Sequence, residues 1–378
     1  MIMKKHKICI VGNGLTGLIS ALILNHEEID IDLIAESKIN KIKDLRSTAI
    51  SEANFDYLKK KIKNLKINHF NPVNKINLYY EGNNKIKNFL NFNEQKKLMF
   101  FFENTKLKSH LFKLIRQTKI KVLNKQVKAI DPLNNKIITN TSSKIYDLII
   151  LCLGPKSKIY KKLLGNREIG RDYYEQSITG NVKHKIRDLG AQQYFLKEGP
   201  LAVLPFKKNN FSIVWSLDNK YYFKNKKNIL LITRNKLNKL LKTKKIKIDK
   251  IQSYPLRLSL KTKYFKKNIL VLGDGLHIIH PIAGQGFNLI LRDIRKVNDL
   301  IKYNIRLGLS LKDSGIFKNF TQSRKPENLL LGLGIDSTRK FFKSSKYLDP
   351  LKENILDTFS KSELLKSLAK RIANLGVN

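Results

Sequence analysis

The chain has 378 residues, with 74 lysines and arginines against 30 aspartates and glutamates, and its formal net charge is +44. This length suggests two or three domains and is enough to bury a substantial core. Its two cysteines, Cys9 and Cys152, both lie in apolar strand-like segments, which argues against a disulfide-stapled fold and favours core residues in a reducing compartment. The seven histidines show no zinc-ligand spacing with the cysteines, so we expect no metal site.

The lysine excess has three interpretations. It is spread along the chain with clusters at residues 59–66, 220–250 and 261–267, as compositional bias would produce. A cationic surface on anionic lipid is the second interpretation, because each lysine near such a membrane contributes ~1 kcal/mol. Nucleic-acid binding is the third, but no zinc finger, helix-turn-helix or RNA-binding aromatic motif accompanies the lysines, so we expect no nucleic-acid partner.

The first predicted element is a buried strand at residues 8–11, followed at once by a glycine-rich turn and a helix. The pattern G-x-G-x-x-G between strand and helix is typical of dinucleotide binding. Gly12 allows the tight turn, Gly14 lets the backbone approach a pyrophosphate, and Gly17 lets helix and strand pack closely; Leu15 and Thr16 complete the turn. The alternative is a glycine-rich turn without a ligand. The same glycines argue against a signal peptide or a membrane span here.

A second predicted strand, residues 29–35, ends at Glu36. An acidic side chain at this place accepts hydrogen bonds from the ribose of adenosine. Because an acid would repel a phosphorylated ribose, Glu36 favours FAD or NAD.

The segment 269–293 predicts a strand, a turn and the start of a helix. Residues 269–272 form the apolar strand, and Asp274 lies between two glycines that end it. A helix starting near Phe287 would direct free backbone N–H groups and its positive dipole end at a ligand in the turn. A flavin, which becomes anionic on reduction, suits that position. His277 and His280 flank the turn and are either packing or catalytic residues.

These two segments, with others in the same order, resemble the ubiquinone-biosynthesis hydroxylases, FAD-dependent aromatic monooxygenases with the para-hydroxybenzoate hydroxylase fold. Residues 281–288 are similar to that family's second flavin motif throughout. The resemblance runs from residue 8 to about residue 343 and includes the segments 44–51, 174–176, 199–205, 212–215 and 255–257.

The resemblance implies an α/β fold with a discontinuous Rossmann-like FAD-binding domain, a mostly antiparallel substrate-domain sheet over the flavin, and C-terminal helices. The expected FAD-binding domain comprises residues 1–68, 98–168 and 268–330, the substrate domain residues 69–97 and 169–267, and the C-terminal helical segment residues 331–378. Within them, we expect sheet strands at 73–80, 172–184, 200–206 and 211–217, a helix at 103–116 and one strand at 122–130. The tail from residue 352 predicts a helix, either packed on the protein or lying on a membrane.

The resemblance also assigns cofactor contacts. Asp274 would accept a hydrogen bond from the ribityl chain or nearby hydroxyls, and Arg46 would bind near the pyrophosphate or ribityl. The backbone at Val127 would run past the adenine. The flavin's pyrimidine edge would meet the segment that contains Pro281, Gly284, Gln285, Gly286 and Asn288. The chemistry would belong to the cofactor, so no catalytic side chain is predicted.

The implied reaction is hydroxylation, with O₂ and through a flavin C4a-hydroperoxide, of the aromatic ring of a polyprenylated phenol or quinol. NAD(P)H is the expected reductant, although Leu153 and Tyr160 replace an aspartate and an arginine of the family's middle motif. The expected location is the cytoplasm, peripheral on the inner face of an anionic membrane, with a quinone-biosynthesis complex as a further partner. Alternatives are a flavoprotein reductase or dehydrogenase on the same fold, or a non-catalytic FAD-bearing partner in such a complex.

Overall fold

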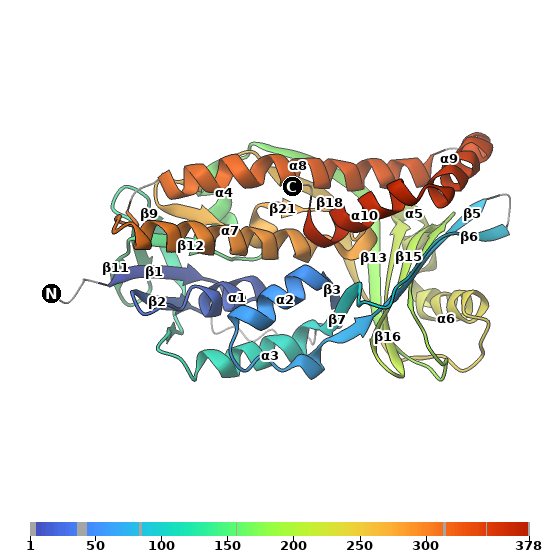
Figure 1. Cartoon of the computed structure of the whole chain (residues 1–378), viewed down its shortest axis with the longest axis horizontal. Helices are drawn as coiled ribbons and strands as arrows, with labels where there is room; N and C mark the ends of the chain where they lie inside the picture. The colour runs from blue at the N-terminus through green and yellow to red at the C-terminus, as the bar shows by residue number, and fades with distance from the viewer. Residues whose placement is uncertain are drawn as a thin grey trace.

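The structure, a computed structural model, describes residues 5–35, 44–82, 85–155, 157–312, 315–344 and 346–376. Its α/β architecture, with a parallel sheet, a mostly antiparallel sheet and C-terminal helices, confirms the expected fold class. The long axis of the molecule runs from the parallel sheet near the N-terminus to the large antiparallel sheet at the other end (Figure 1).

The first sheet carries the nucleotide-binding pattern. Its strands pair in parallel except for one edge hairpin, and their apolar residues are buried on both faces, as a parallel sheet covered by helices requires. In sheet order the strands are β19 (Phe265–Lys266), β20 (Ile269–Val271), β12 (Leu148–Leu151), β1 (His6–Val11), β2 (Ile29–Ile34) and β8 (Lys121–Leu123). Cys9 and Cys152 are buried here as free thiols, which confirms their prediction as core residues.

The strand predicted at residues 122–130 is wrong as a single element. Three polar residues, 124–126, interrupt the apolar pattern, and the two halves join different sheets. β8 pairs in parallel with β2, whereas the second half belongs to a three-stranded antiparallel sheet of β9 (Val127–Asp131), β10 (Lys136–Thr139) and β11 (Ser143–Ile145).

The large sheet is antiparallel except where β14 and β5 pair in parallel. Its order is β21 (His277–Ile278), β18 (Gln252–Lys261), β13 (Glu168–Lys183), β16 (Asn210–Asp218), β15 (Gly199–Lys207), β14 (Ala191–Leu196), β5 (Lys75–Gly82) and β6 (Lys85–Asn93), with β17 (Lys247–Ile248) beside β13. The strands predicted at 172–184, 200–206 and 211–217 are confirmed as β13, β15 and β16, and most of the one predicted at 73–80 is β5, whereas Val73 belongs to β4. A small sheet of β3 (Ser47–Ser51), β7 (Met99–Glu103) and β4 (Asn71–Val73) lies between the two large sheets.

The helices connect and cover these sheets. They are α1 (Leu15–Ile23), α2 (Glu52–Lys61), α3 (Asn104–Ile115), α4 (Lys158–Leu164), α5 (Asn219–Asn225), α6 (Ile229–Leu240), α7 (Gly286–Arg306), α8 (Gly315–Lys343), α9 (Asp349–Lys361) and α10 (Glu363–Leu375). The helix predicted at residues 103–116 is therefore confirmed as α3. Helix α8 runs beside α7 and continues to the large sheet, so it joins the two ends of the molecule (Figure 1).

The C-terminal tail packs on the protein at its end. Asn374 accepts hydrogen bonds from Ser51 Oγ and from the Ala53 amide, each 3.0 Å long, and Arg292 reaches two carbonyls of the last turn of α10. Among the described residues, no helix combines the length and apolarity needed to span a bilayer. Our domain boundaries stay a prediction, although the parallel sheet draws its strands from residues 6–34, 121–151 and 265–271.

Candidate active site

Three turns meet at the carboxyl edge of the parallel sheet, where β1, β12 and β20 end. In such sheets, ligands bind at this edge, beside the strand at which the order reverses direction, and β1 is that strand here. The turn after β1 approaches Cys152, and Gly273 in the turn after β20 approaches Thr16. Segments far apart in sequence therefore lie together at this edge.

The three glycines of the first turn differ in what an added Cβ atom would contact. A Cβ atom on Gly12, whose φ is +120°, would lie 2.4 Å from the Cys152 carbonyl oxygen, and one on Gly17 would lie 1.9 Å from the Gly12 carbonyl oxygen. A Cβ on Gly14 would meet nothing within 4 Å. Gly12 and Gly17 are thus required for folding, whereas Gly14 faces open space at the start of α1, where a pyrophosphate binds in dinucleotide folds. Leu15 and Thr16 begin the helix beside it.

Asp274 and Arg46 lie near each other at this edge, close enough for their charges to interact. Asp274 lies in the short 3₁₀ turn η3 (Gly273–Gly275). Its side chain is accessible, but the protein crowded around it desolvates the carboxylate and raises its pKa, an effect that the charges of His277 and Arg46 partly offset. Arg46 makes a bidentate pair with Asp44, with both bonds 2.9 Å long, and its guanidinium lies 5.2 Å from the ring centre of Tyr254. Arg46 is therefore held in place by its neighbours.

The segment that leads into α7 is fixed by a buried amide. Pro281 precedes the 3₁₀ turn η4 (Ile282–Gly284), Gln285 caps α7, and Gly286 is its first residue. The fully buried side chain of Asn288 accepts hydrogen bonds from the Ser51 amide at 2.9 Å and from Asn54 Nδ2 at 2.8 Å. Only the backbone of Asn288 is thus left for a cofactor, and its side chain aligns the turn with β3 and α2.

Of two further residues predicted to contact the cofactor, the structure describes one. Val127 is the first residue of β9 and is buried in the core beside the parallel sheet. Glu36 lies outside the described residues.

The two departures from the family's middle motif touch each other. The hydroxyl of Tyr160 donates a 2.5 Å hydrogen bond to the Leu153 carbonyl, and its buried ring contacts Gly275, where a Cβ would lie 2.5 Å from Cζ. Tyr160 therefore joins the turn after β12 to the turn that carries Asp274. An arginine in its place would bury a guanidinium, while Leu153 is only partly buried and tolerates a polar side chain.

The large sheet presents an unusually polar buried face towards the turn at 281–286. On one side of β16, Phe211, Ile213, Trp215 and Leu217 pack in the core beneath α5 and α6. The alternate residues, together with their partners in β13 and β14, include Ser177, Thr179, Asn181, Gln193, Ser212 and Ser216. The ends of this face pack on Ile282 and Ala49, beside the turn.

Three oxygens on this polar face, Thr179 Oγ1, Asn181 Oδ1 and Ser212 Oγ, are buried and have no hydrogen-bond partner among the described residues. Buried polar atoms are nearly always paired in folded proteins. These three oxygens have almost no accessible surface, so they contribute to the polar character of this sheet face and are not open to a ligand.

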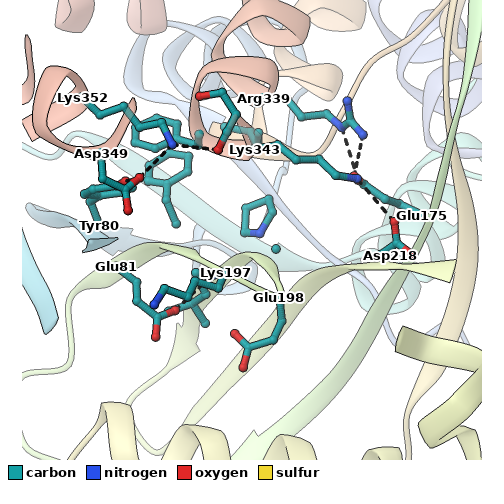
Figure 2. Close-up of a pocket in the computed structure, with 17 residues that line it drawn as sticks. Tyr80, Glu81, Glu175, Lys197, Glu198, Asp218, Arg339, Lys343, Asp349 and Lys352 are labelled. Atoms are coloured by element: carbon teal, nitrogen blue, oxygen red, sulfur yellow. Dashed lines mark hydrogen bonds and ion pairs between the residues drawn. The ribbon is translucent and has the colours of Figure 1, made fainter. Parts of the chain in front are cut away.

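A cavity of about 310 Å³ lies at the end of the polar face, between the large sheet and the helices α8 and α9 (Figure 2). Glu175 of β13 is its main charged residue: it accepts bonds from Arg339 Nη2 at 2.5 Å and Lys343 Nζ at 2.8 Å, and its second oxygen lies 3.1 Å from His280 Nε2. Although burial alone would raise it, the pKa of Glu175 is lowered by these hydrogen bonds. His280 is thus a buried link between the cavity wall and the turn at 281–286.

His277 belongs to a second buried network, beneath α7. Its Nε2 lies 2.8 Å from Asp293, which also accepts a 2.7 Å bond from Arg324. Arg324 pairs in turn with Glu327. Both histidines that flank the turn therefore have structural partners, as the packing interpretation requires.

Comparisons with known proteins find similarity to flavin-dependent hydroxylases. A family model described as an FAD binding domain matches residues 147–305. The chain is 25% identical to the ubiquinone biosynthesis monooxygenase COQ6 of Dictyostelium discoideum, over 89% of this chain and 84% of that protein. It is 26% identical to the ubiquinone hydroxylase UbiL of Rhodospirillum rubrum, over 52% and 46% of the two chains. The crystal structure of p-nitrophenol 4-monooxygenase PnpA from Pseudomonas putida matches with a TM-score of 0.77 at 14% identity, over 97% and 98%.

Sequence reasoning did not find the polar sheet face, the Glu175 cluster or the role of the Asn288 side chain. The alternation of serine with apolar residues along β16 was a usable signal, because its two faces differ in polarity while both are buried. No local signal could pair Asn288 with Ser51, which is 237 positions away. The chain is thus similar in sequence to hydroxylases of ubiquinone biosynthesis, contains a segment that matches an FAD binding domain, and has the fold of FAD-dependent monooxygenases.

Proposed function

We propose that this protein is an FAD-dependent monooxygenase that hydroxylates the aromatic ring of a polyprenylated phenol or quinol in ubiquinone biosynthesis. The observation that carries the proposal is the carboxyl edge of the parallel sheet, where the open backbone of Gly14 lies near the turn that carries Asp274 and where the charge of Arg46 reaches the Asp274 carboxylate. The similarity to hydroxylases of ubiquinone biosynthesis supports the substrate class.

Different parts of the protein would hold the cofactor and the substrate. The open backbone at Gly14 and the N-terminus of α1 would hold the pyrophosphate, and Asp274 and Arg46 would hold the polar chain between pyrophosphate and ring. Bound FAD supplies the activation of O₂, so that one oxygen atom goes to the ring and the other leaves as water. The sheet excludes water from the reacting ring and orients its oxygens.

NAD(P)H is the reductant that we propose, with a slow transfer to the flavin. Leu153 stands where relatives carry an aspartate, and one charged hydrogen bond is worth ~1.5–3 kcal/mol, or roughly one to two orders of magnitude in rate. Leu153→Asp should therefore speed flavin reduction by about tenfold or more, as measured by stopped-flow bleaching of the flavin band.

Leu153→Asn is the matched control, because it has the shape of aspartate without its charge and should give little gain. Fast reduction of the unmodified protein, with no gain from Leu153→Asp, would show that the missing aspartate is dispensable here. Tyr160 is left unchanged in this test because its hydroxyl and ring hold two turns together.

Leu153, which replaces the aspartate of the family's middle motif, also supports a second candidate function, a non-catalytic flavoprotein partner in a quinone-biosynthesis complex. Such a protein would bind FAD as tightly but would yield no hydroxylated product with any reductant. A reductase or dehydrogenase on this fold would be distinguished by flavin reoxidation without oxygen transfer to a ring.

We further propose that the protein acts in the cytoplasm, peripheral on the inner face of an anionic membrane. The support is the net charge of +44 together with a prenylated substrate that resides in lipid.

Cells that lack the protein test the function directly. They should accumulate a prenylated intermediate that lacks one ring hydroxyl, and the position of that hydroxyl names the carbon on which the enzyme acts. Normal quinone content, with no such intermediate, would contradict the proposal.

A further inference from the structure

The outer side of the large sheet carries a concentrated cationic surface. Residues 219–250 form α5, the turn η2 (Lys226–Asn228), α6 and β17, and this segment contains a single acidic residue, Asp249. Ten of its lysines are exposed: Lys220, Lys224, Lys226, Lys227, Lys239, Lys242, Lys244, Lys245, Lys247 and Lys250. None of the ten forms an ion pair with another residue that the structure describes, so their charges are not neutralised locally.

Large apolar side chains are exposed within the same segment. Phe223 on α5 is 57% exposed and Leu231 on α6 is 53% exposed. The opposite side of α6, with Ile229, Thr233 and Leu237, is buried against the sheet. The outer side of the segment thus combines lysines with aromatic and aliphatic groups, the combination that elements at the level of lipid headgroups present.

The cationic surface lies next to the cavity. Helix α6 lies at the end of the molecule remote from the N-terminus (Figure 1). Its Lys236 makes a 2.6 Å ion pair with Glu198, which lines the cavity in Figure 2. The cationic surface and the cavity therefore share a border, and a lipid-resident molecule has a short route between them.

We propose that residues 219–250 are the surface on which this protein docks on an anionic phospholipid bilayer, with the lysines at the headgroups and with Phe223 and Leu231 inserted between them. The proposal rests on the membrane-associated function proposed above. A bilayer is favoured over other polyanions because it alone accommodates both the charge and the exposed aliphatic Leu231.

The test compares two sets of lysines. The docking set is Lys226→Gln, Lys227→Gln, Lys244→Gln and Lys245→Gln in one protein. The control set is Lys59→Gln, Lys60→Gln, Lys63→Gln and Lys66→Gln, four exposed lysines in and after α2, beside the exposed Ile67. Both proteins lose the same charge, so compositional bias alone predicts the same loss of binding.

The measurement is co-sedimentation of the FAD-loaded protein with vesicles of phosphatidylcholine, with and without phosphatidylglycerol. Each lysine near an anionic surface is worth about fivefold in binding, so the docking set should weaken binding by two orders of magnitude or more, and the control set only slightly. Binding of the unmodified protein should require phosphatidylglycerol and weaken as salt rises to physiological levels. Equal losses in the two sets, or binding that ignores lipid charge, would overturn the proposal.

A third protein, with Phe223→Ser and Leu231→Ser, separates a bilayer from other polyanions. We expect it to lose about tenfold or more in vesicle binding while it binds heparin as the unmodified protein does. Unchanged vesicle binding would overturn the insertion of these side chains and leave a general polyanion surface. Retained flavin and an unchanged melting temperature would show that each variant is folded, and because no readout uses activity, failure of docking and failure of hydroxylation are distinguishable.

Discussion

Protein with Gly14→Val should fold and yet contain no FAD. The valine Cβ meets no protein atom within 4 Å, and the backbone of Gly14, with φ −73° and ψ 177°, is open to any residue. The added methyl groups would, however, occupy the space in front of α1 that the pyrophosphate needs. We expect a loss of FAD affinity of at least about two orders of magnitude, since the backbone amides there bind a charged group.

The ratio of flavin to protein absorbance after purification measures this loss, and added FAD tests for residual binding. Gly334→Val is the matched control, because Gly334 is an exposed glycine of α8 whose Cβ would also meet nothing within 4 Å. A yellow Gly14→Val protein with normal affinity would show that the cofactor lies elsewhere. Because no histidine or cysteine lies at an obvious flavin-linking position, denaturation of the unmodified protein should release free FAD.

Glu175→Gln should destabilise the fold strongly. Glu175 is 4% exposed and is paired with Arg339, which is 9% exposed, so its loss leaves a buried guanidinium without its partner. Breaking a buried pair in this way costs about 3–5 kcal/mol. Lys343 adds less, because its side chain is half exposed and water screens its charge. Chemical denaturation measures the free energy of unfolding.

The difference in unfolding free energy between the unmodified protein and Glu175→Gln should change with pH in one direction. The folded pKa of Glu175 is lowered from its ordinary value of 4.5, so its contribution to stability is present above that value and lost as the pH falls. The gap between the unmodified protein and Glu175→Gln should therefore narrow below about pH 4.5. Glu363→Gln, which breaks an ion pair at an 86% exposed carboxylate, should cost under about 1 kcal/mol. Equal costs for the two changes would contradict the buried-pair account.

The architecture was accessible from local patterns in the sequence. Strand, glycine turn and helix at residues 6–23 follow from periodicity and from the conformational needs of Gly12, and the turn at Asp274 follows from the same reasoning. The two segments were expected to meet because both were predicted to bind the flavin, and in the structure Gly273 contacts Thr16.

What escaped prediction depends on long-range partners. Residues 122–130 were predicted as one strand because apolar residues stand at both ends of the segment, but the two ends pair with different strands, β2 and β10. The partners of Glu175 come from β13, the turn at His280 and the end of α8, and no spacing rule joins them. Tyr160 was interpreted only as the replacement of an arginine of the family's motif, whereas its hydrogen bond to the Leu153 carbonyl gives it a structural role.

Incorporation of oxygen from ¹⁸O₂ tests the central claim most directly. The FAD-loaded protein, a chemical reductant or NAD(P)H, and a prenylated phenol should give a product heavier by one ¹⁸O atom, with the second atom in water. The use of a chemical reductant makes the result independent of Leu153. Flavin that reduces and reoxidises repeatedly in the presence of the phenols that accumulate in deficient cells, without any labelled product, would contradict the assignment as a hydroxylase.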